Sequence, residues 1–243
     1  MNWIALGDTI IFDYKFNNKL DITLISAYTK LIFSNYELNE KINDQLFIFY
    51  ANNYNFDDNY YYSKFNQDVS NLPSTLTHLT FGWCFNQDVS ALPQNLTNLT
   101  FGCNFNQDIS KLPSTLIHLG LGQHFKQQIT FYPNIKYLKL NCNNQYIIDF
   151  LPNFIIELEL GCNFKLKMDN LPTSIKKIII NKDSSYDKDL NCLPDFVEEL
   201  HLNRYYPKRI LRIPSNLKKI VCYVDYPYKN DFALFCHIQT YTR

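Results

Sequence analysis

The chain of 243 residues has no net charge and no long apolar run, and these absences exclude several classes of protein. Lysine plus arginine equals aspartate plus glutamate at 23 each, and no basic run stands out. A chain with this balance has no field that attracts nucleic acid or an anionic membrane, so we expect neither as a partner. The opening MNWIALGD lacks a basic start and is interrupted by Asp8, so we expect no signal peptide and no membrane helix.

The sequence also lacks paired-cysteine motifs and known catalytic motifs. The seven cysteines are an odd number with no C-x-x-C pair, which favours reduced thiols in the cytoplasm over a secreted disulfide framework. The sequence contains no G-x-S-x-G, no phosphate-binding loop, no H-E-x-x-H and no G-x-G-x-x-G. We therefore expect no enzyme, no cofactor, no catalytic residues and no metal site.

What the chain does contain is a tandem repeat of about twenty residues. Eight prolines follow Leu, Tyr or Ile at intervals of 19 to 22 residues, at positions 73, 93, 113, 133, 152, 172, 194 and 214. Three successive units from Phe65, Phe85 and Phe105 are nearly identical, beginning FNQDVSNLPSTLTHLTFG. A period of this length indicates one small structural unit stacked many times in a solenoid.

Each unit predicts one short strand. In LP-x-x-L-x-x-L-x-F-G the last two apolar residues are two apart, which places both on one side of a strand. The predicted inward pairs are Leu79/Phe81, Leu99/Phe101, Leu119/Leu121, Leu138/Leu140, Leu158/Leu160, Ile178/Ile180, Leu200/Leu202 and Ile220/Cys222. The remaining segment of each unit contains proline and no helical period, so it predicts an extended or polyproline-like return. The predicted fold is mainly β: a leucine-rich-repeat-like solenoid with a parallel sheet on one face and no regular helices on the other.

Two further columns of the repeat predict the interior and the turns. Aromatic residues stand eight positions before the prolines, and aliphatic residues such as Val69 and Ile129 stand four before them, so both columns are expected to be buried. The residue after each strand is Gly82, Gly102, Gly122, Asn141, Gly161, Asn181 or Asn203. Because glycine and asparagine enter the left-handed region most easily, these positions predict turns with positive φ. Asn104, Asn143 and Asn163 are expected to be buried amides that bond to neighbouring backbone.

The ends of the chain depart from the regular pattern. Residues 1–64 align with decayed repeats whose strands lie near Ile10, Leu31 and Phe49, and residues of about 52–64 predict an inserted loop. The regular repeats cover residues 65–222, and residues 223–243 predict a C-terminal cap. The cap is expected to cover the last layer with Phe232, Leu234, Phe235 and Ile238. About eleven strands are expected in total.

The motif FNQDVSNLPSTLTHLTFG resembles that of FNIP-repeat proteins, a leucine-rich-repeat-like family of amoebae and giant viruses. The match covers Phe65 to about Cys222, although Asp68, Asp88 and Asp108 stand where the family usually has proline. The resemblance implies an intracellular protein, in the host cytoplasm if it is viral. Some family members carry an F-box, which implies an adaptor of a ubiquitin ligase. Residues 1–64 align better with decayed repeats than with an F-box.

The outward residues of the strands form columns that are charged in the later repeats and nearly uncharged in the earlier ones. The later strands alternate in charge, as in Glu157, Lys177, Glu199 and Lys219, which predicts cross-strand ion pairs that fix the register. The earlier strands are nearly uncharged. Their candidate contact residues for a protein partner are Phe47, Ile48, Tyr50, His78, Asn98, His118 and Tyr137. The centres of interfaces favour aromatic residues and exclude unpaired charge, although an ordinary threonine-rich strand face is the alternative.

Two possible reactive sites on this face are weaker interpretations. His78 and His118 are two strand spacings apart, about 10 Å, which is too far for joint zinc ligation without a third element. Glu198 and Glu199 have lysines on both neighbouring strands, which favours ion pairs over a catalytic carboxylate pair. We therefore predict a monomeric, non-enzymatic scaffold that binds an unknown protein through its sheet face. The alternative is a substrate-recognition adaptor of a ubiquitin ligase.

Overall fold

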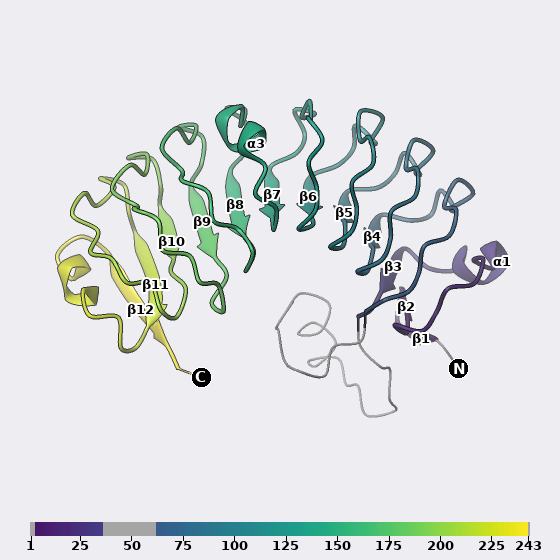
Figure 1. Ribbon diagram of the computed structural model, residues 1–243, viewed down its shortest axis with the longest axis horizontal. Helices are drawn as coiled ribbons and strands as arrows, with labels where there is room; N and C mark the ends of the chain where they lie inside the picture. The colour runs from purple at the N-terminus through teal and green to yellow at the C-terminus, as the bar shows by residue number, and fades with distance from the viewer. Residues whose placement is uncertain (1–2, 36–61, 243) are drawn as a thin grey trace. The chain divides into compact units, whose positions relative to one another are not determined.

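The structure is a computed structural model that describes residues 3–35 and 62–242. The chain divides into two compact units, Met1–Asn134 and Ile135–Arg243, which we call unit 1 and unit 2. In each unit the strands stand side by side, and the return segments run along the opposite side of the coils (Figure 1). This arrangement is the predicted leucine-rich-repeat-like solenoid.

Unit 1 contains one antiparallel pair of strands followed by a parallel ladder. Its strands are β1 (Trp3–Leu6), β2 (Thr9–Phe12), β3 (Lys30–Phe33), β4 (His78–Thr80), β5 (Asn98–Thr100) and β6 (His118–Leu121). β1 and β2 form a hairpin, and β2 to β6 pair in parallel in the order of the sequence. The strands predicted near Ile10 and Leu31 are β2 and β3. The one predicted near Phe49 falls outside the described residues.

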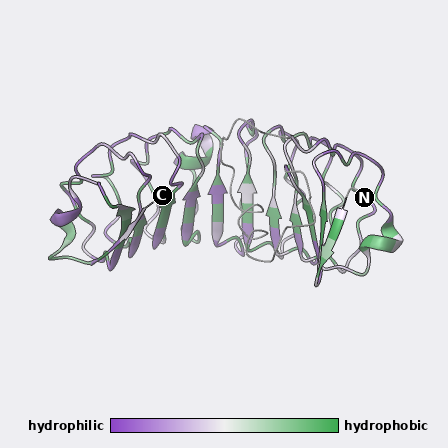
Figure 2. Cartoon of the chain, turned by 90° about the horizontal axis from the view of Figure 1, so that it is seen from below, coloured by the Kyte–Doolittle hydropathy of each residue, from purple (hydrophilic) through white to green (hydrophobic). Residues whose placement is uncertain are grey.

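Unit 2 is parallel throughout its described strands. They are β7 (Tyr137–Leu140), β8 (Glu157–Leu160), β9 (Lys177–Ile180), β10 (Glu199–His201), β11 (Lys219–Tyr223) and β12 (His237–Tyr241). Each strand pairs with the next along the sequence. Hydrophilic and hydrophobic residues follow one another along these strands (Figure 2). This alternation gives each strand one buried and one outward side, because successive side chains point to opposite faces.

The returns are extended, with single helical turns at a few places in the described residues. α1 (Ile22–Ile25) begins at Asp21, whose carboxylate accepts hydrogen bonds from the backbone N–H groups of Thr23 and Leu24. α3 (Gln145–Asp149) and the 3₁₀ turn η1 (Lys229–Phe232) are equally short. The predicted fold class is therefore confirmed.

The interior consists of the predicted columns. All eight inward pairs are buried, and the aromatic column is buried from Phe65 to Tyr206. In unit 1 the rings also stack, with centroids 3.6 Å apart for Phe81 and Phe85 and 3.7 Å apart for Phe101 and Phe105. In the aliphatic column Ile129 is an exception, because it is only half-buried.

The prediction of positive φ after each strand is wrong. Among the described residues only Gly7, in the β1–β2 hairpin, has a positive φ, of 57°. At positions 102 and 122 glycine is required for a different reason, namely the close approach of consecutive coils. A Cβ atom on Gly102 would lie 1.9 Å from the carbonyl oxygen of Gly82, and one on Gly122 would lie 1.8 Å from that of Gly102. The backbone of one coil therefore occupies the space of a side chain in the next.

The predicted burial of Asn104, Asn143 and Asn163 is wrong, because none of the three is buried, but the predicted bonding to neighbouring backbone is confirmed for Asn143, whose amide donates to the carbonyl oxygen of Asn163 at 2.9 Å. In unit 1 an asparagine ladder lies at the Asn that follows the Phe of the regular repeats. The side-chain oxygen of Asn66 accepts the backbone N–H of Asn86 at 2.8 Å, and Asn86 accepts that of Asn106 at 2.9 Å. Each asparagine thus satisfies a backbone donor one coil further on, which fixes the stacking of the coils.

Three aspartates of the regular repeats form local turns. Asp68, Asp88 and Asp108 each accept the backbone N–H and the hydroxyl of the serine two residues on, at 2.8–3.0 Å. Asp and Ser are typical of such side-chain-stabilised turns. These hydrogen bonds lower the pKa of all three carboxyl groups. A hydrogen-bonded carboxylate therefore holds this bend of the return.

The β3 coil continues directly beside the regular repeats. The side-chain oxygen of Asn35 accepts the backbone N–H groups of Ser63, at 3.0 Å, and Trp83, at 2.9 Å. The coil therefore resumes at Ser63, and β3 pairs with β4 without an intervening strand. At the other end β12 adds a strand beyond the last repeat. Of the predicted capping residues Phe232 is buried, whereas Leu234 and Phe235 are exposed.

Candidate protein-binding surface

Three of the predicted contact residues form one row in unit 1. His78, Asn98 and His118 begin β4, β5 and β6, and the strand register makes them direct neighbours. Tyr137 begins β7 in unit 2, where 37% of its surface is exposed. Phe47, Ile48 and Tyr50 lie outside the described residues. The structure therefore brings together the histidine and asparagine part of the predicted surface.

Lys30 extends this row by one strand. It is the register partner of His78, so the row reads Lys30, His78, Asn98 and His118 across β3 to β6. Sequence reasoning missed Lys30 because its repeat has decayed. The signal was present, since Lys30 precedes the inward Leu31 as His78 precedes the inward Leu79. We call the outward residues of these strands the unit 1 face: Thr29, Lys30, Ile32, Thr77, His78, Thr80, Thr97, Asn98, Thr100, Ile117 and His118.

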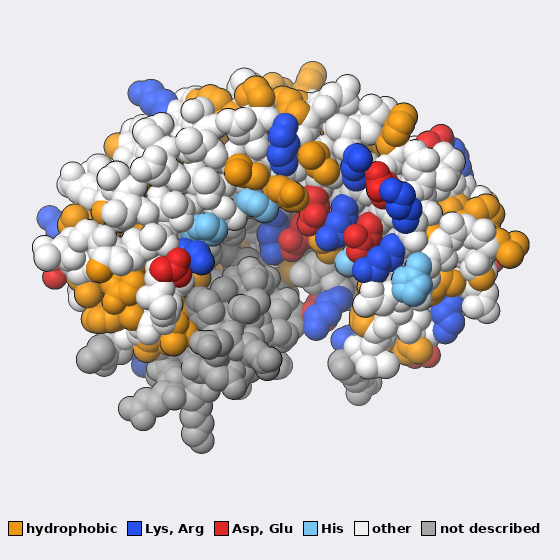
Figure 3. Space-filling view, turned by 180° about the vertical axis from the view of Figure 1, so that it is seen from behind, with side chains coloured by type: hydrophobic (Ala, Val, Ile, Leu, Met, Phe, Trp, Pro, Cys, Tyr) orange, Lys and Arg blue, Asp and Glu red, His pale blue; other side chains and the backbone are white. Residues whose placement is uncertain are grey.

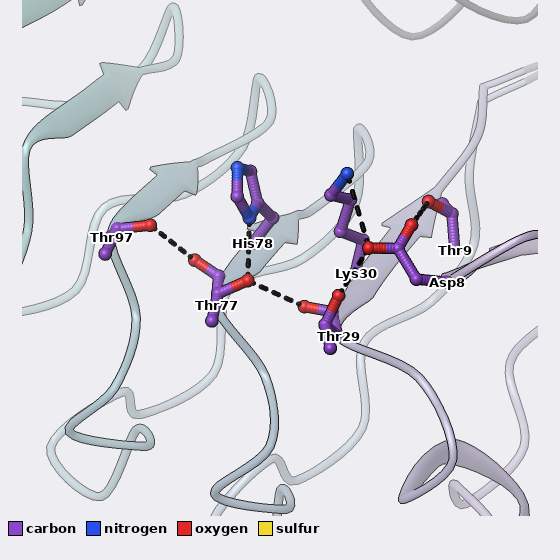
Figure 4. Close-up of polar contacts among 7 residues, drawn as sticks. All are labelled: Asp8, Thr9, Thr29, Lys30, Thr77, His78 and Thr97. Atoms are coloured by element: carbon purple, nitrogen blue, oxygen red, sulfur yellow. Dashed lines mark hydrogen bonds and ion pairs between the residues drawn. The ribbon is translucent and has the colours of Figure 1, made fainter.

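A column of threonines lies beside the row and positions it (Figure 4). The hydroxyl oxygens of Thr77 and Thr97 lie 3.2 Å from the carbonyl oxygens of Thr29 and Thr77, one coil earlier. The hydroxyl of Thr77 is also 2.8 Å from Nδ1 of His78, and that of Thr97 is 2.9 Å from Oδ1 of Asn98. These contacts fix the side chains of the row relative to the backbone.

One carboxylate, Asp8, stands at the N-terminal edge of the row. It lies 3.4 Å from the Lys30 ammonium and accepts hydrogen bonds from the hydroxyls of Thr29 at 2.7 Å and Thr9 at 3.1 Å. The hydrogen bond from Thr29 is the main reason that the pKa of Asp8 is lowered, and Thr9 and Lys30 act in the same direction. Asp8 is thus already engaged by three donors.

Burial is the main influence on the electrostatics of His78. Burial lowers the pKa of His78, and repulsion by Lys30 and His118 lowers it further, while Asp8 acts in the opposite direction. The ring is therefore neutral near pH 7, with its charged form disfavoured by its surroundings.

Unit 2 presents a different face, in which the predicted charge ladder is confirmed. Neighbouring strands pair Lys139 with Glu159 at 2.6 Å, Lys177 with Glu157 at 3.5 Å, Lys176 with Glu198 at 3.1 Å, Lys218 with Glu198 at 2.5 Å and Lys219 with Glu199 at 3.1 Å. Blue and red side chains lie side by side in this region (Figure 3). Each acidic group of the ladder contacts a lysine, so its charge is neutralised within the unit.

Glu198 and Glu199 of this ladder have lowered pKa values. Hydrogen bonds from Lys218 and Lys176 lower the pKa of Glu198. Burial works to raise the pKa of Glu199, but hydrogen bonds from His201 and Lys219 outweigh it, and the pKa is lowered. A proton-transferring pair needs one carboxyl group with a raised pKa, so these residues do not have the properties of an acid–base pair.

The described residues contain no cluster of three or more His, Cys, Asp or Glu side chains with metal-binding geometry. All seven cysteines lie within the described part of the chain and carry reduced thiols. Burial raises the pKa of the Cys103 and Cys142 thiols to about 11, so both are protonated at neutral pH. No helix in residues 3–35 and 62–242 has the length and apolar character to span a bilayer.

Comparisons with known proteins agree with this architecture. The family model for the FNIP repeat matches residues 65–104, 85–124 and 143–183. No curated protein matches the chain. Among solved structures the chain is similar to CroV588, described as a novel circular LRR protein structure and originating from a giant virus, with 29% identity and a TM-score of 0.56. The similarity covers 87% of this chain and 33% of that one, so the chain spans about a third of the length of CroV588.

Proposed function

We propose that this chain, an FNIP-repeat protein with a leucine-rich-repeat-like fold, is a non-enzymatic scaffold that binds another protein through the unit 1 face. Repeat solenoids expose long, regular surfaces that suit protein recognition. The observation that carries the proposal is the contrast between the two sheet faces. In unit 2 the outward charges form a ladder of ion pairs, whereas the row from Lys30 to His118 carries, among the residues that the structure describes, one ion pair at its edge, between Lys30 and Asp8.

The unit 1 face has the composition of a contact surface. Its centre is polar but carries few charges, and Ile32 and Ile117 add apolar area beside the row. Its threonine hydroxyls and the Asn98 amide offer both donors and acceptors of hydrogen bonds. Burying such a surface against a partner avoids the desolvation of opposed charges that the unit 2 ladder would require.

A matched pair of substitutions tests the proposal. Ile117 in unit 1 and Ile156 in unit 2 occupy the same position of the repeat, and each is 37% exposed. The full chain, Ile117→Arg and Ile156→Arg are used as bait in native cells, and recovered proteins are quantified by mass spectrometry. We expect Ile117→Arg to remove at least one protein that the other two retain. Equal recovery with both variants would contradict a binding role for the unit 1 face.

The same experiment addresses the adaptor role that the family resemblance implies. Recurrent recovery of ubiquitin-ligase subunits with the full chain would favour a substrate-recognition adaptor over a simple scaffold. We further propose that the protein acts as a monomer in the cytoplasm, the host cytoplasm if it is viral, and its seven reduced thiols support a reducing compartment. Light scattering on the purified chain gives its mass in solution, and a dimer would contradict the monomer.

A further inference from the structure

We infer that β12, the last strand of the ladder, accepts an extended segment of another protein as an additional parallel strand (Figure 1). Polar and apolar side chains alternate in this segment. The surface lies in unit 2, so the inference goes beyond the proposed function of the unit 1 face and does not depend on it. Strand addition supplies affinity through main-chain hydrogen bonds and specificity through alternate side chains.

Some backbone polar groups of β12 point away from β11. The strands pair in parallel, and the backbone N–H of His237 donates to a carbonyl oxygen of the β11 coil at 2.9 Å. At the other end of β12 the carbonyl oxygen of Tyr241 accepts the N–H of Val224 at 3.1 Å. Because the pairing groups alternate along a parallel strand, the N–H and C=O groups of Ile238 and Thr240 point to the other edge. Among the residues that the structure describes, no strand pairs with that edge.

The edge of β12 lacks the features that usually protect an exposed strand. Soluble proteins cover such edges or place lysine, proline or a bulge there. The five residues HIQTY include no lysine, proline or acidic residue, and their register with β11 is uninterrupted. The strand is also held in place, because the Tyr241 hydroxyl donates to the carbonyl oxygen of Leu202 at 3.0 Å and the Tyr241 ring lies 5.7 Å from that of Tyr223. The edge is therefore preorganised for pairing.

The side chains of the last coil explain why the segment alternates. The register places Ile238 in line with the inward Ile220, which is fully buried. Ile238 itself is only half-buried, and Leu234 and Phe235, which precede β12, are 95% and 62% exposed. Apolar side chains on the inward side of an added strand remove such surface from water. The outward side chains of the segment continue the solvent-facing side of the sheet, where polar residues fit.

The direction of the segment follows from the ladder that it extends. The strand pairs of unit 2 are parallel, so a parallel segment continues their twist and their inward column. A second copy of this chain does not fit here through its own β12, because two identical edges related by a twofold axis pair antiparallel. A strand of a different protein therefore suits this edge, in agreement with the proposed monomer.

The ladder also predicts which backbone groups of the segment pair with β12. The inward Leu202 donates its N–H to the carbonyl oxygen of the outward Val221, on the following strand, at 2.8 Å. Inward residues thus pair with the following strand, and outward residues pair with the preceding one. In a parallel segment the outward polar residues therefore pair with β12. In an antiparallel segment the inward apolar residues would pair instead.

The test uses a fluorescent eight-residue peptide with three Thr-Val repeats between two terminal lysines. Two further versions carry N-methyl groups on all three threonines or on all three valines. Fluorescence anisotropy measures the binding of each peptide to the natural chain. We expect threonine methylation to weaken binding at least about tenfold, because it removes the N–H groups that donate to β12, and valine methylation to change binding by less than about twofold.

Matched variants assign the binding to the edge of β12. Thr240→Pro removes an N–H at the free edge and leaves the hydrogen bonds to β11 in place, and proline is tolerated on an edge strand at such a position. We expect it to weaken binding of the unmethylated peptide at least about fivefold, whereas Thr240→Ala, which keeps the N–H, should change binding by less than about twofold. Thermal melts compare the folding of the two variants. In the natural chain, hydrogen exchange should show that the N–H groups of Ile238 and Thr240 become protected when the peptide binds.

Several results would overturn the inference. These are absence of binding by the unmethylated peptide, equal effects of the two methylations, or weakening by valine methylation alone, which assigns an antiparallel segment. Unchanged binding by a folded Thr240→Pro variant would also overturn it, and if that variant does not fold, the methylated peptides and hydrogen exchange decide on the natural chain. A dimer of the natural chain that Thr240→Pro dissociates would make a second copy the occupant instead.

The same peptide separates this inference from the proposed function. Ile117→Arg lies in unit 1 and is expected to leave peptide binding unchanged. Loss of peptide binding in Thr240→Pro with full recovery of native proteins by Ile117→Arg would support the β12 edge and contradict the unit 1 face. The opposite pair of results would contradict the β12 edge and leave the proposed function standing.

Discussion

Unit 1 and unit 2 use the same repeat, but their sheet faces contribute differently to holding the coils in register. In unit 1 the rings of Phe81, Phe85, Phe101 and Phe105 stack inside, and the asparagine ladder links the returns outside the sheet. In unit 2 the returns are linked in the same way, since the side-chain oxygen of Asn143 accepts the backbone N–H of Lys165 at 2.7 Å, and cross-strand ion pairs line the sheet face in addition. A parallel stack needs some device against slippage. When the contacts that prevent slippage lie in the core and the returns, the outward residues of the sheet are not needed for register and can bind a partner.

This comparison also explains why the same outward position has different chemistry in the two units. Glu199 holds register through Lys219 and His201, so its identity is set by its neighbours in the fold. His78 and Asn98 make contacts with threonines of their own strands, and these contacts contribute little to register between coils. Residues that the fold does not require are the better candidates for recognition.

The largest effect is expected from removing the aromatic stack. Phe85→Ala should cost about 3–5 kcal/mol of unfolding free energy, because it creates a cavity and removes the contact with Phe81. Phe164→Ala in unit 2 should cost less by about 0.5–1.5 kcal/mol, since its ring is 6.0 Å from Tyr186. Urea melts of the full chain measure both. A larger loss for Phe164→Ala would contradict the assignment of register to the unit 1 rings.

The next effect separates steric from conformational glycines. Gly102→Ala should destabilise by about 2–3 kcal/mol, because the new Cβ overlaps the carbonyl of Gly82. Gly7→Ala should cost about 1 kcal/mol, because its φ is 57° while the space around it is open. Gly7→Asn should lose less stability than Gly7→Ala, because asparagine tolerates a positive φ. Gly102→Asn should lose at least as much stability as Gly102→Ala, because its Cβ atom meets the same carbonyl group. If Gly102→Asn were clearly more stable than Gly102→Ala, a requirement for positive φ would explain this glycine better than the close approach of the coils.

Charge reversal should destabilise unit 2 and leave unit 1 nearly unchanged. Glu199→Lys is expected to cost about 1 kcal/mol at low salt, because it places a third cation beside Lys177 and Lys219. Adding Lys219→Glu should recover part of the loss, and high salt should reduce it. Asn98→Lys should change stability by less than about 0.5 kcal/mol. A larger effect of Asn98→Lys would show that the unit 1 face is also required for register.

The smallest effect concerns the aspartate turns in acid. Their pKa values are lowered by the following serines, so the stability that they contribute is present above about pH 4 and is lost as the pH falls further. The triple variant Asp68→Asn/Asp88→Asn/Asp108→Asn keeps the hydrogen-bond acceptor without the titration. Its melting temperature should fall less between pH 6 and pH 3 than that of the natural chain. An identical fall would show that other groups control the acid response.

Much of the fold follows from the repeat period. The spacing of Leu79 and Phe81, copied every twenty residues, is enough to predict strands, their parallel pairing and the buried columns. The errors have a common origin in contacts between coils. Gly102 signals that no side chain fits there, but the sequence does not distinguish a constraint on φ from the backbone of the next coil. The ladder from Asn66 to Asn106 likewise joins residues twenty apart, which single-repeat patterns do not reveal.

The candidate surface was predictable where the repeats are regular and incomplete where they decay. His78, Asn98 and His118 follow from the alignment of the repeats, and the register confirms their row. Lys30 and Asp8 were missed because β3 lacks the Leu-Pro motif and the β1–β2 hairpin does not belong to a repeat at all. Whether this surface binds a partner stays a prediction, since binding depends on a second molecule.

The most direct test of the central claim is photo-crosslinking to a native partner. A photoreactive amino acid is placed at position 117 in unit 1 or at position 156 in unit 2, which are equivalent in the repeat and equally exposed. After irradiation in native cells, covalent adducts are identified by mass spectrometry. The account predicts a specific protein adduct from position 117 and none from position 156. An adduct of the same protein from position 156 alone, or from both positions equally, would contradict it.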